Sequence, residues 1–187
     1  IAGASGRIYQ INSEGTVFFD TPGHPVQFKQ YGVFLQAGKQ LINDQLKITT
    51  SARYDKNDYF NGHITPRLSA IYSFGTRLEN NIRASIQTAF RFPSIADQMV
   101  DINVGPFIIL GGLPEVQAQY NFSDNPVYPL SGGNPVTDKP VTENGPYIIP
   151  EFRPERVISA EIGYKALLMR KRLMIDTYVY SNQYNGF

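Results

Sequence analysis

Apolar and polar side chains alternate along most of the chain from Gln30 onward, in segments of about ten residues. A period of two residues is typical of β-strands whose two faces meet different surroundings. The pattern predicts four strands in the range 30–92 and two in the range 156–187, joined as antiparallel hairpins. The segment from Leu46 to Asp55 shows the clearest alternation, since its apolar residues oppose an almost unbroken row of charged and hydroxyl side chains.

The remaining parts of the chain lack this alternation. Residues 93–155 contain most of the prolines together with two Gly-Gly pairs. We predict that this range forms one very long loop, with a helical turn near 94–99. Residues 1–29 are predicted to form a loop or the end of a strand.

Hairpin register follows from the need to keep the apolar faces together, because a slip of one residue moves every side chain to the opposite face. Paired residue numbers should therefore have an odd total around Asn43 and an even total around Asn57 and Arg77. The last strand, 173–182, is apolar on both faces. We place Asp176 on the polar face, because a carboxylate that faces lipid is costly.

The lengths of the connections suggest which environment the apolar face meets. The short connections alternate with longer ones at the opposite end of the predicted strands, and the longest spans about sixty residues, which is unusual in a compact soluble domain. Outer-membrane barrels combine short periplasmic turns with longer external loops. Aromatic residues near the ends of the apolar faces fit an interfacial girdle, although Tyr and Phe also simply favour strands.

Composition narrows the possible chemistry. The 17 basic and 16 acidic residues are nearly balanced, unlike the basic excess of nucleic-acid binders. The chain has no Cys and only two histidines, His24 and His63, so we expect no zinc site, no cofactor and no enzymatic activity. No apolar run approaches the roughly 20 residues of a membrane helix. If the chain crosses a membrane, it should do so with strands.

Five runs of residues, in their order and spacing, resemble the barrel of TonB-dependent receptors of the Bacteroidota type. These runs are 30–36, 46–49 with 53–55, 65–69, 82–85 with 88–94, and 152–155 with 159–164. The resemblance covers roughly residues 30–183. It implies an all-β fold, namely a fragment of an antiparallel transmembrane β-barrel with about six strands and one very long external loop.

The resemblance also implies a function and a set of partners. Receptors of this family have a barrel of about 22 strands that is closed by an N-terminal plug. About six strands cannot close such a barrel, and we find neither a plug nor its coupling box in the sequence. We therefore expect residues 1–187 to be part of one barrel domain whose partners are the rest of the barrel, the plug, a periplasmic TonB-type energy-coupling protein and lipid. The expected role is energised uptake of a scarce solute across the outer membrane of a Gram-negative bacterium, with siderophore, cobalamin, glycan and peptide all open as substrates.

Candidate ligand contacts lie on the polar face and in the long loop. Four arginines, Arg53, Arg67, Arg83 and Arg91, should point into the lumen, where they either contact solute or plug or form ion pairs between neighbouring strands. Arg91 precedes the long loop and is the strongest candidate for a ligand or plug contact. The loop candidates combine rings with an amide: Tyr120, Asn121, Phe122, Tyr128 and Tyr147. These rings either stack on a ligand or pack together as a lid.

Two other functions fit parts of the pattern. A soluble or surface-attached β-sandwich that binds carbohydrate or protein through its long loop would also show two-faced strands. A small passive barrel would need more strands than the pattern predicts. Asp124 and Asp138 could bind Ca²⁺, but they lack the regular ligand spacing of a Ca²⁺ loop, so no metal site is assigned and a role for Ca²⁺ stays open.

Overall fold

The computed structural model describes residues 1–105, 107–122, 124–134, 138–149 and 152–186. The chain divides into two compact units. The sheet unit consists of Ile1–Arg7, Lys29–Phe92 and Pro154–Phe187, and the loop unit consists of Ile8–Phe28 and Pro93–Arg153.

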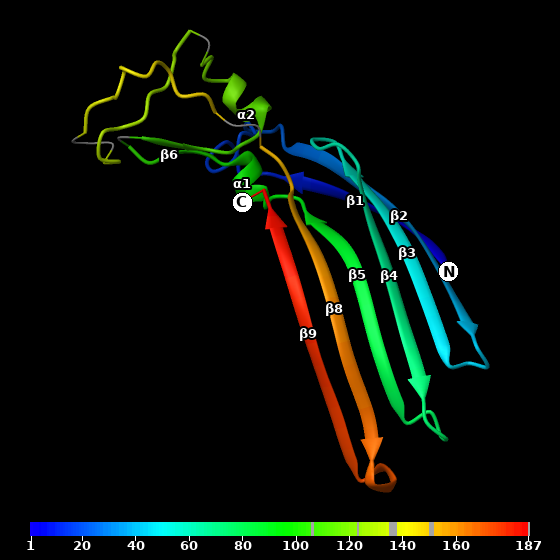
Figure 1. The fold of residues 1–187 in the computed structure, drawn as a ribbon. Helices are drawn as coiled ribbons and strands as arrows, with labels where there is room; N and C mark the ends of the chain where they lie inside the picture. Colours follow the sequence, from blue (N-terminus) through cyan, green and yellow to red (C-terminus); the bar gives the residue numbers. More distant parts are fainter. Residues whose placement is uncertain (106, 123, 135–137, 150–151, 187) are drawn as a thin grey trace. The chain divides into compact units, whose positions relative to one another are not determined.

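A seven-stranded sheet with the order β1-β2-β3-β4-β5-β8-β9 dominates the fold (Figure 1). The strands are β1 (Ala2–Ile11), β2 (Val26–Leu41), β3 (Leu46–Asn57), β4 (His63–Phe74), β5 (Asn80–Arg91), β8 (Glu155–Leu168) and β9 (Leu173–Asn185). A 3₁₀ turn, Met169–Lys171, joins β8 to β9. Among the described residues no pairing joins β1 to β9, so the sheet has two open edges. The predicted all-β, antiparallel architecture is confirmed.

The registers keep the apolar residues on one face, as predicted from the alternation. Val33 pairs with Tyr54, Thr50 pairs with Leu68, and Leu68 pairs with Ile86. The numbers of paired residues add up to an odd value in the β2–β3 hairpin and to an even value in the β3–β4 and β4–β5 hairpins. These values confirm the predicted parities. The same face continues onto β8, where Ile86 lies opposite Ala160. The sheet therefore has one apolar and one polar face across β2 to β8.

The last strand follows the predicted orientation. Asp176 pairs with Lys165 and lies on the polar face, where one of its carboxylate oxygens is 3.1 Å from Arg83 Nη2. On the opposite face, Val179 pairs with Ile162. The charge of Asp176 is thus compensated on the polar face rather than exposed on the apolar one.

The structure adds one strand to the six that the sequence analysis expects, because β1 lies in the range assigned to a loop or strand end. Ile1, which directly precedes β1, is anchored by two hydrogen bonds, both 2.8 Å long, that join its backbone to that of Gln36. β1 is rich in Gly, Ala and Ser, so it shows little apolar alternation. The small side chains have a packing reason, since a Cβ on Gly3 would lie only 2.3 Å from the ring of Phe34.

The loop unit has secondary structure and a core of its own. It contains α1 (Ile95–Met99), β6 (Asp101–Asn103), β7 (Ile108–Leu110) and α2 (Pro114–Ala118). α1 begins with a capping box between Ser94 and Asp97, which confirms the predicted helical turn. Met99, Leu113 and Val116 are fully buried and form the centre of this core. The first part of the long connection between β5 and β8, up to Ala118, is therefore folded.

A second segment, far away in the sequence, completes the loop unit. Asp101 N donates to Val17 O at 2.9 Å, and Phe19 N donates to Met99 O at 3.2 Å. These bonds attach the β1–β2 connection to α1 and β6. Within the described part of the chain, no helix is long and apolar enough to cross a bilayer.

Candidate functional site on the polar face of the sheet

Charged side chains gather on the polar face of the sheet, where most of the ion pairs join different strands and one, Arg53–Asp55, lies within β3. Because directly opposed residues share a face, the registers place the expected arginines together on this side. The ion pairs are Arg53–Asp55, Arg83–Glu161, Arg83–Asp176, Lys165–Asp176 and Arg91–Glu155. Arginine is well suited to such pairing, because its planar fork of donors matches a carboxylate.

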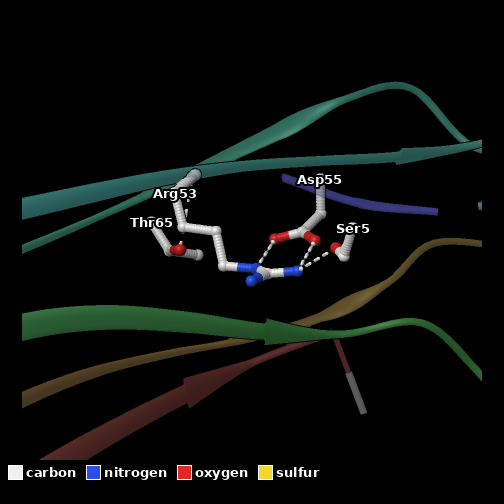
Figure 2. Close-up of polar contacts among 4 residues, drawn as sticks. All are labelled: Ser5, Arg53, Asp55 and Thr65. Carbon is white, nitrogen blue, oxygen red and sulfur yellow. Dashed lines mark hydrogen bonds and ion pairs between the residues drawn. The ribbon is translucent and has the colours of Figure 1, made fainter. Parts of the chain in front are cut away.

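The Arg53–Asp55 pair has the most buried carboxylate of these ion pairs. Figure 2 shows its contacts. Arg53 Nε and Nη2 each donate to one oxygen of Asp55 at 2.6 Å, and Nη2 also donates to Ser5 Oγ at 3.1 Å. The side chain of Asp55 is only 7% exposed, whereas that of Arg53 is 44% exposed. Thr65 Oγ1 donates to the backbone oxygen of Arg53 at 3.4 Å. Contacts to β1 and β4 thus hold Arg53, and Asp55 of the same sheet neutralises its charge.

Gly32 makes room for this pair. Asp55 lies directly opposite Gly32 in the β2–β3 register. A Cβ on Gly32 would lie 2.3 Å from Asp55 Oδ1 and 2.8 Å from Arg53 Nη2. Only glycine leaves space here for the carboxylate and the guanidinium together.

Arg83 joins three strands on the same face. Its Nε lies 3.3 Å from Glu161 on β8 and its Nη2 lies 3.1 Å from Asp176 on β9. The guanidinium carbon is 5.7 Å from the centre of the Tyr178 ring, which is within the range of a cation–π contact. Lys165 approaches Asp176 at 3.9 Å. The structure therefore holds Arg83 in a cross-strand network.

Arg67 and Arg91 are placed differently. Arg67 lies between Ser51 and Gln87 in the registers. It has no ion-pair partner among the residues that the structure describes. Arg91 Nη2 lies 2.8 Å from Glu155, yet the Arg91 side chain is 72% exposed. Both guanidinium groups are therefore accessible from the polar side of the sheet.

A cavity of about 320 Å³ adjoins Arg91. Ala89, Val157 and Tyr184 line it and lie opposite one another in the registers of β5, β8 and β9. Three further residues complete the lining: Phe90, Glu155 and Arg156, together with Arg91 itself. The sequence analysis does not identify this cavity, although Ala89 and Val157 interrupt the polar pattern of their strands and are its only signal.

An aromatic cluster lies where β4 begins and β5 ends, close to Arg91. The ring of His63 is 4.9 Å from that of Phe90, and the ring of Phe92 is 5.7 Å from that of Phe60. Arg156 Nη2 lies 3.0 Å from His63 Nδ1. His63 is thus packed against the rings of Phe90 and Phe92.

The loop unit brings some of the expected ligand residues together. Tyr120 Oη donates to Asp101 Oδ1 at 2.5 Å, and the rings of Tyr120 and Phe122 stack at 6.2 Å. Donation to Asp101 raises the pKa of Tyr120 above its ordinary value. Asn121 Nδ2 donates to Asp124 at 2.6 Å and so belongs to the same turn.

The two other loop candidates lie apart from this group. Tyr147 N donates to Val127 O at 2.8 Å, next to Tyr128, and the Tyr147 side chain is exposed. No ring contact joins Tyr128 or Tyr147 to Tyr120 in the described ranges. The five loop candidates therefore form two groups rather than a single platform.

A second cavity, of about 620 Å³, lies beside Tyr120 in the loop unit. Its lining includes Phe18, Phe19 and Asp20 from the β1–β2 connection as well as Asp101. Burial alone would raise the pKa of Asp20, but hydrogen bonds from Ser13 hold it below its ordinary value. Sequence reasoning missed the β1–β2 side of this cavity, because only the tertiary fold brings it next to Tyr120.

The described residues contain no cluster of three or more His, Asp and Glu side chains that would suit a metal ion. The two carboxylates considered for Ca²⁺ have local partners. Asp124 accepts from Asn121 Nδ2 at 2.6 Å, and Asp138 accepts from Asn134 N at 2.7 Å. Both carboxylates therefore stabilise turns.

Comparison with known protein families gives one match. The model described as TonB dependent receptor-like, beta-barrel, matches residues 3–187. A search of curated proteins gives no match. The family match covers both the sheet unit and the loop unit.

Proposed function

The chain belongs to the family of TonB-dependent receptor-like β-barrels, and we propose on that basis that it serves in energised uptake of a scarce solute across the outer membrane. The family has a receptor and transport role in the outer membrane. We further propose that a periplasmic energy-coupling partner drives the uptake by this protein. In this proposal residues 1–187 are part of one barrel domain, and the protein is located in the outer membrane of a Gram-negative bacterium.

The observation that carries this proposal is the contrast between the two faces of the sheet. Large apolar side chains on one face are uncovered: Leu35 is 63% exposed, Ile162 is 58% exposed and Ile86 is 53% exposed. A soluble protein rarely leaves such a continuous apolar surface open. A lipid-facing barrel wall has this surface by necessity, with its polar side chains directed to the lumen.

The β-sandwich alternative would need a second sheet to cover the apolar face. The only other sheet in the described part of the chain is formed by β6 and β7, each three residues long. Strands of that length cannot cover seven strands of 10 to 16 residues. The lipid bilayer is the covering that fits the whole face.

We assign different roles to the candidate residues within this function. Arg53 and Arg83 stabilise the wall, because carboxylates of the same sheet already neutralise them. Arg67 and Arg91 face the lumen with accessible guanidinium groups and contact solute or plug. The external residues Tyr120, Asn121, Phe122, Tyr128 and Tyr147 take part in capture of the solute.

The sheet needs further strands to complete a barrel, since each open edge carries unpaired backbone donors and acceptors that lipid cannot satisfy. We propose that the remainder of the same barrel supplies these strands, and that a plug within it transmits energy from a TonB-type protein. The plug is expected outside these 187 residues.

The test uses the complete receptor, expressed in a Gram-negative host with and without the energy-coupling protein. We expect the receptor in the outer-membrane fraction, with the heat-dependent gel mobility of a folded barrel. Metabolite analysis of the medium should show a solute that is depleted only when receptor and coupling protein are both present. A protein that is monodisperse in water without detergent would instead support the β-sandwich.

A further inference from the structure

The apolar face of the sheet carries a few charged side chains, and those in the registers are basic. Lys39 lies opposite Ile48 on this face, and Arg156 lies opposite Phe90. The carboxylates of the described strands of this sheet all lie on the polar face: Asp55, Glu155, Glu161 and Asp176. A face on which apolar side chains alternate only with cations suits a medium that is apolar inside and anionic at its surface. A bilayer with phosphate headgroups has this character.

Lys39 lies close to one end of the sheet, two residues before the end of β2. Figure 1 shows the turns after β2, β4 and β8 at this same end. The Lys39 side chain is exposed, and its ammonium group has no ion pair or hydrogen bond within the part of the chain that the structure describes. In the proposed orientation the short turns face the periplasm, so Lys39 lies near the headgroups of the inner leaflet.

A hollow of about 430 Å³ adjoins Lys39 on the apolar face. It lies between β2 and β3, where the small side chain of Ala37 pairs with Thr50 and leaves space over the sheet. This volume is at the lower end of the range, roughly 300–1,000 Å³, that is usual for small-molecule sites. The complete lining contains no carboxylate: Ala37, Gly38, Lys39, Leu41, Ile48 and Thr50.

The polar groups of the hollow follow a definite order along the strands. Thr50 lies two residues farther from the turn than Ile48, the partner of Lys39, which is about 7 Å along an extended strand. Its side chain is exposed, and its hydroxyl has no hydrogen-bond partner in the described ranges. Beyond it lie Leu35 and Ala52, which are apolar. The order from the turn is therefore a cation, a hydroxyl donor and an apolar surface.

A diacyl phospholipid has its groups in the matching order, namely phosphate, ester and hydrocarbon chain. From these observations we propose that the hollow lined by Ala37, Lys39, Ile48 and Thr50 binds one anionic phospholipid of the inner leaflet. The phosphate accepts from the Lys39 ammonium group, an ester oxygen accepts from Thr50 Oγ1, and one acyl chain lies over Ala37 toward Leu35. The inference goes beyond solute uptake, but it rests on the proposed function because it requires that this face meets lipid.

The lining also predicts which lipids bind less well. The ammonium of a phosphatidylethanolamine headgroup finds no carboxylate in the lining, so a headgroup with a net negative charge is favoured. A diacylglycerol keeps the contacts of the chains but has no phosphate for Lys39. Glycerol 3-phosphate has the phosphate but no chain to fill the hollow. A lysine that simply extends along an apolar surface to reach water would produce no such ranking.

The experiment uses the complete receptor in detergent, so that the rest of the barrel is in place beside β2. Three probes with the same palmitoyl and oleoyl chains are titrated: phosphatidylglycerol, phosphatidylethanolamine and diacylglycerol. Native mass spectrometry measures the fraction of receptor that carries one lipid. We expect a dissociation constant for phosphatidylglycerol on the order of five-fold lower than that for diacylglycerol, as one lysine beside an anionic lipid implies. Phosphatidylethanolamine should lie between them, and glycerol 3-phosphate should not displace any of the three.

Variants locate the binding within the structure. Lys39→Gln should bring the affinity for phosphatidylglycerol down to that for diacylglycerol, and Lys39→Arg should keep the preference. Lys47→Gln is the matched control, because it removes the same charge at the same end of the sheet but from the polar face, opposite Gln40. Ala37→Phe fills the hollow and should weaken the binding of all three lipids. Ala84→Phe makes the same change on the apolar face of β5, outside the lining, and should leave binding unchanged.

The outcomes separate this inference from the proposed function. If the receptor enters the outer membrane and takes up solute, but phosphatidylglycerol and diacylglycerol bind equally, the lipid site alone is refuted. Equal losses in Lys39→Gln and Lys47→Gln would show a general attraction of the receptor for anionic lipid, and equal losses in Ala37→Phe and Ala84→Phe would show binding without the hollow. Either result would overturn the site. Displacement by glycerol 3-phosphate would overturn the role of the chains. A receptor that does not enter the outer membrane would refute the proposed function itself.

Discussion

Replacing Gly32 by alanine should break the ion pair with the most buried carboxylate in the barrel wall. The new Cβ would lie 2.3 Å from Asp55 Oδ1 and 2.8 Å from Arg53 Nη2, both too close for van der Waals contact. The Asp55 side chain is short, so it cannot avoid the methyl group and still accept both hydrogen bonds from Arg53. We therefore expect the Asp55 carboxylate to rotate away from the guanidinium.

The size of the destabilisation by Gly32→Ala follows from the interactions that the Arg53–Asp55 pair loses. Hydrogen bonds to charged groups contribute roughly 1.5–3 kcal/mol each, and a buried acceptor left without a donor costs about 1–3 kcal/mol. Arg53 is 44% exposed, so water compensates part of its loss. A net loss of about 1–3 kcal/mol in the free energy of unfolding is the expected result.

Gly38→Ala is the matched control, because Gly38 lies on the same strand and the same face as Gly32. Its Cβ would be 3.5 Å from Ile48 O and from Thr49 Oγ1, which is ordinary contact. Replacing a strand glycine by alanine without strain should stabilise the barrel slightly, by about 0.4–1 kcal/mol. The two variants should therefore move the stability in opposite directions.

Urea unfolding of the complete receptor in lipid vesicles, followed by the heat-dependent gel mobility of the folded barrel, measures both effects. In an Asp55→Ala background the carboxylate is gone, and Gly32→Ala should add little further destabilisation. If Gly32→Ala is as stable as Gly38→Ala, or if its cost is the same with and without Asp55, the proposed steric conflict is wrong.

Three further predictions test the faces, the topology and the loop unit. Ile86→Arg should destabilise the complete receptor in lipid vesicles by roughly 2–4 kcal/mol, whereas the neighbouring Ser85→Arg, on the polar face, should cost little; equal costs would contradict the lipid-facing assignment. Since the chain has no Cys, a single cysteine at Ile148 should react on intact cells with a maleimide too large to pass porins, and one at Met169 only after the outer membrane is opened. The reverse labelling would show the opposite orientation. The lowered pKa of Asp20 stabilises the loop unit above the ordinary carboxyl value of 3.8, and this contribution should be lost as the pH falls through the lower folded value. Pepsin cleavage of residues 93–149 should rise over that window in the native receptor but not in Asp20→Asn, and an unchanged pH dependence in that variant would contradict the role of the carboxylate.

The sheet was largely predictable because its two faces meet two different environments. The alternation from Leu46 to Asp55 determines which residues point outward, and the registers follow from keeping Leu68 and Ile86 on the same side. β1 gave no such signal, because the close approach of Gly3 to Phe34 requires small residues in place of apolar ones.

The loop unit shows the opposite situation. The capping box at Ser94 is local and could be recognised from the sequence, and Pro114 followed by Glu115 at the start of α2 was a usable signal that the sequence analysis did not use. The contact of the β1–β2 connection with α1 and β6 depends on residues distant in the sequence, such as Val17 and Asp101. The alternation of apolar and polar residues does not predict such a contact.

The candidate site, too, has features that the local sequence predicts and features that depend on contacts between distant residues. Alternation placed the arginines on the polar face, and it placed Asp55 on the same face as Arg53 two residues further along the strand. It could not show that Arg83 is paired, since its carboxylates, Glu161 and Asp176, come from two other strands. Ala89 and Val157 interrupt the polar pattern of their strands, but the sequence analysis draws no inference from them. Only the register brings these two residues next to Tyr184.

The attachment of the β1–β2 connection to the long connection constrains how this receptor can change its specificity. The bridge between Phe18 and Val100 and the hydrogen bond from Asp101 to Val17 join the two connections into a single folded unit. A chimaera that imports only residues 93–153 from another receptor would remove the partners of residues 17–19. The two segments must therefore be exchanged, and must diversify during evolution, as a linked pair.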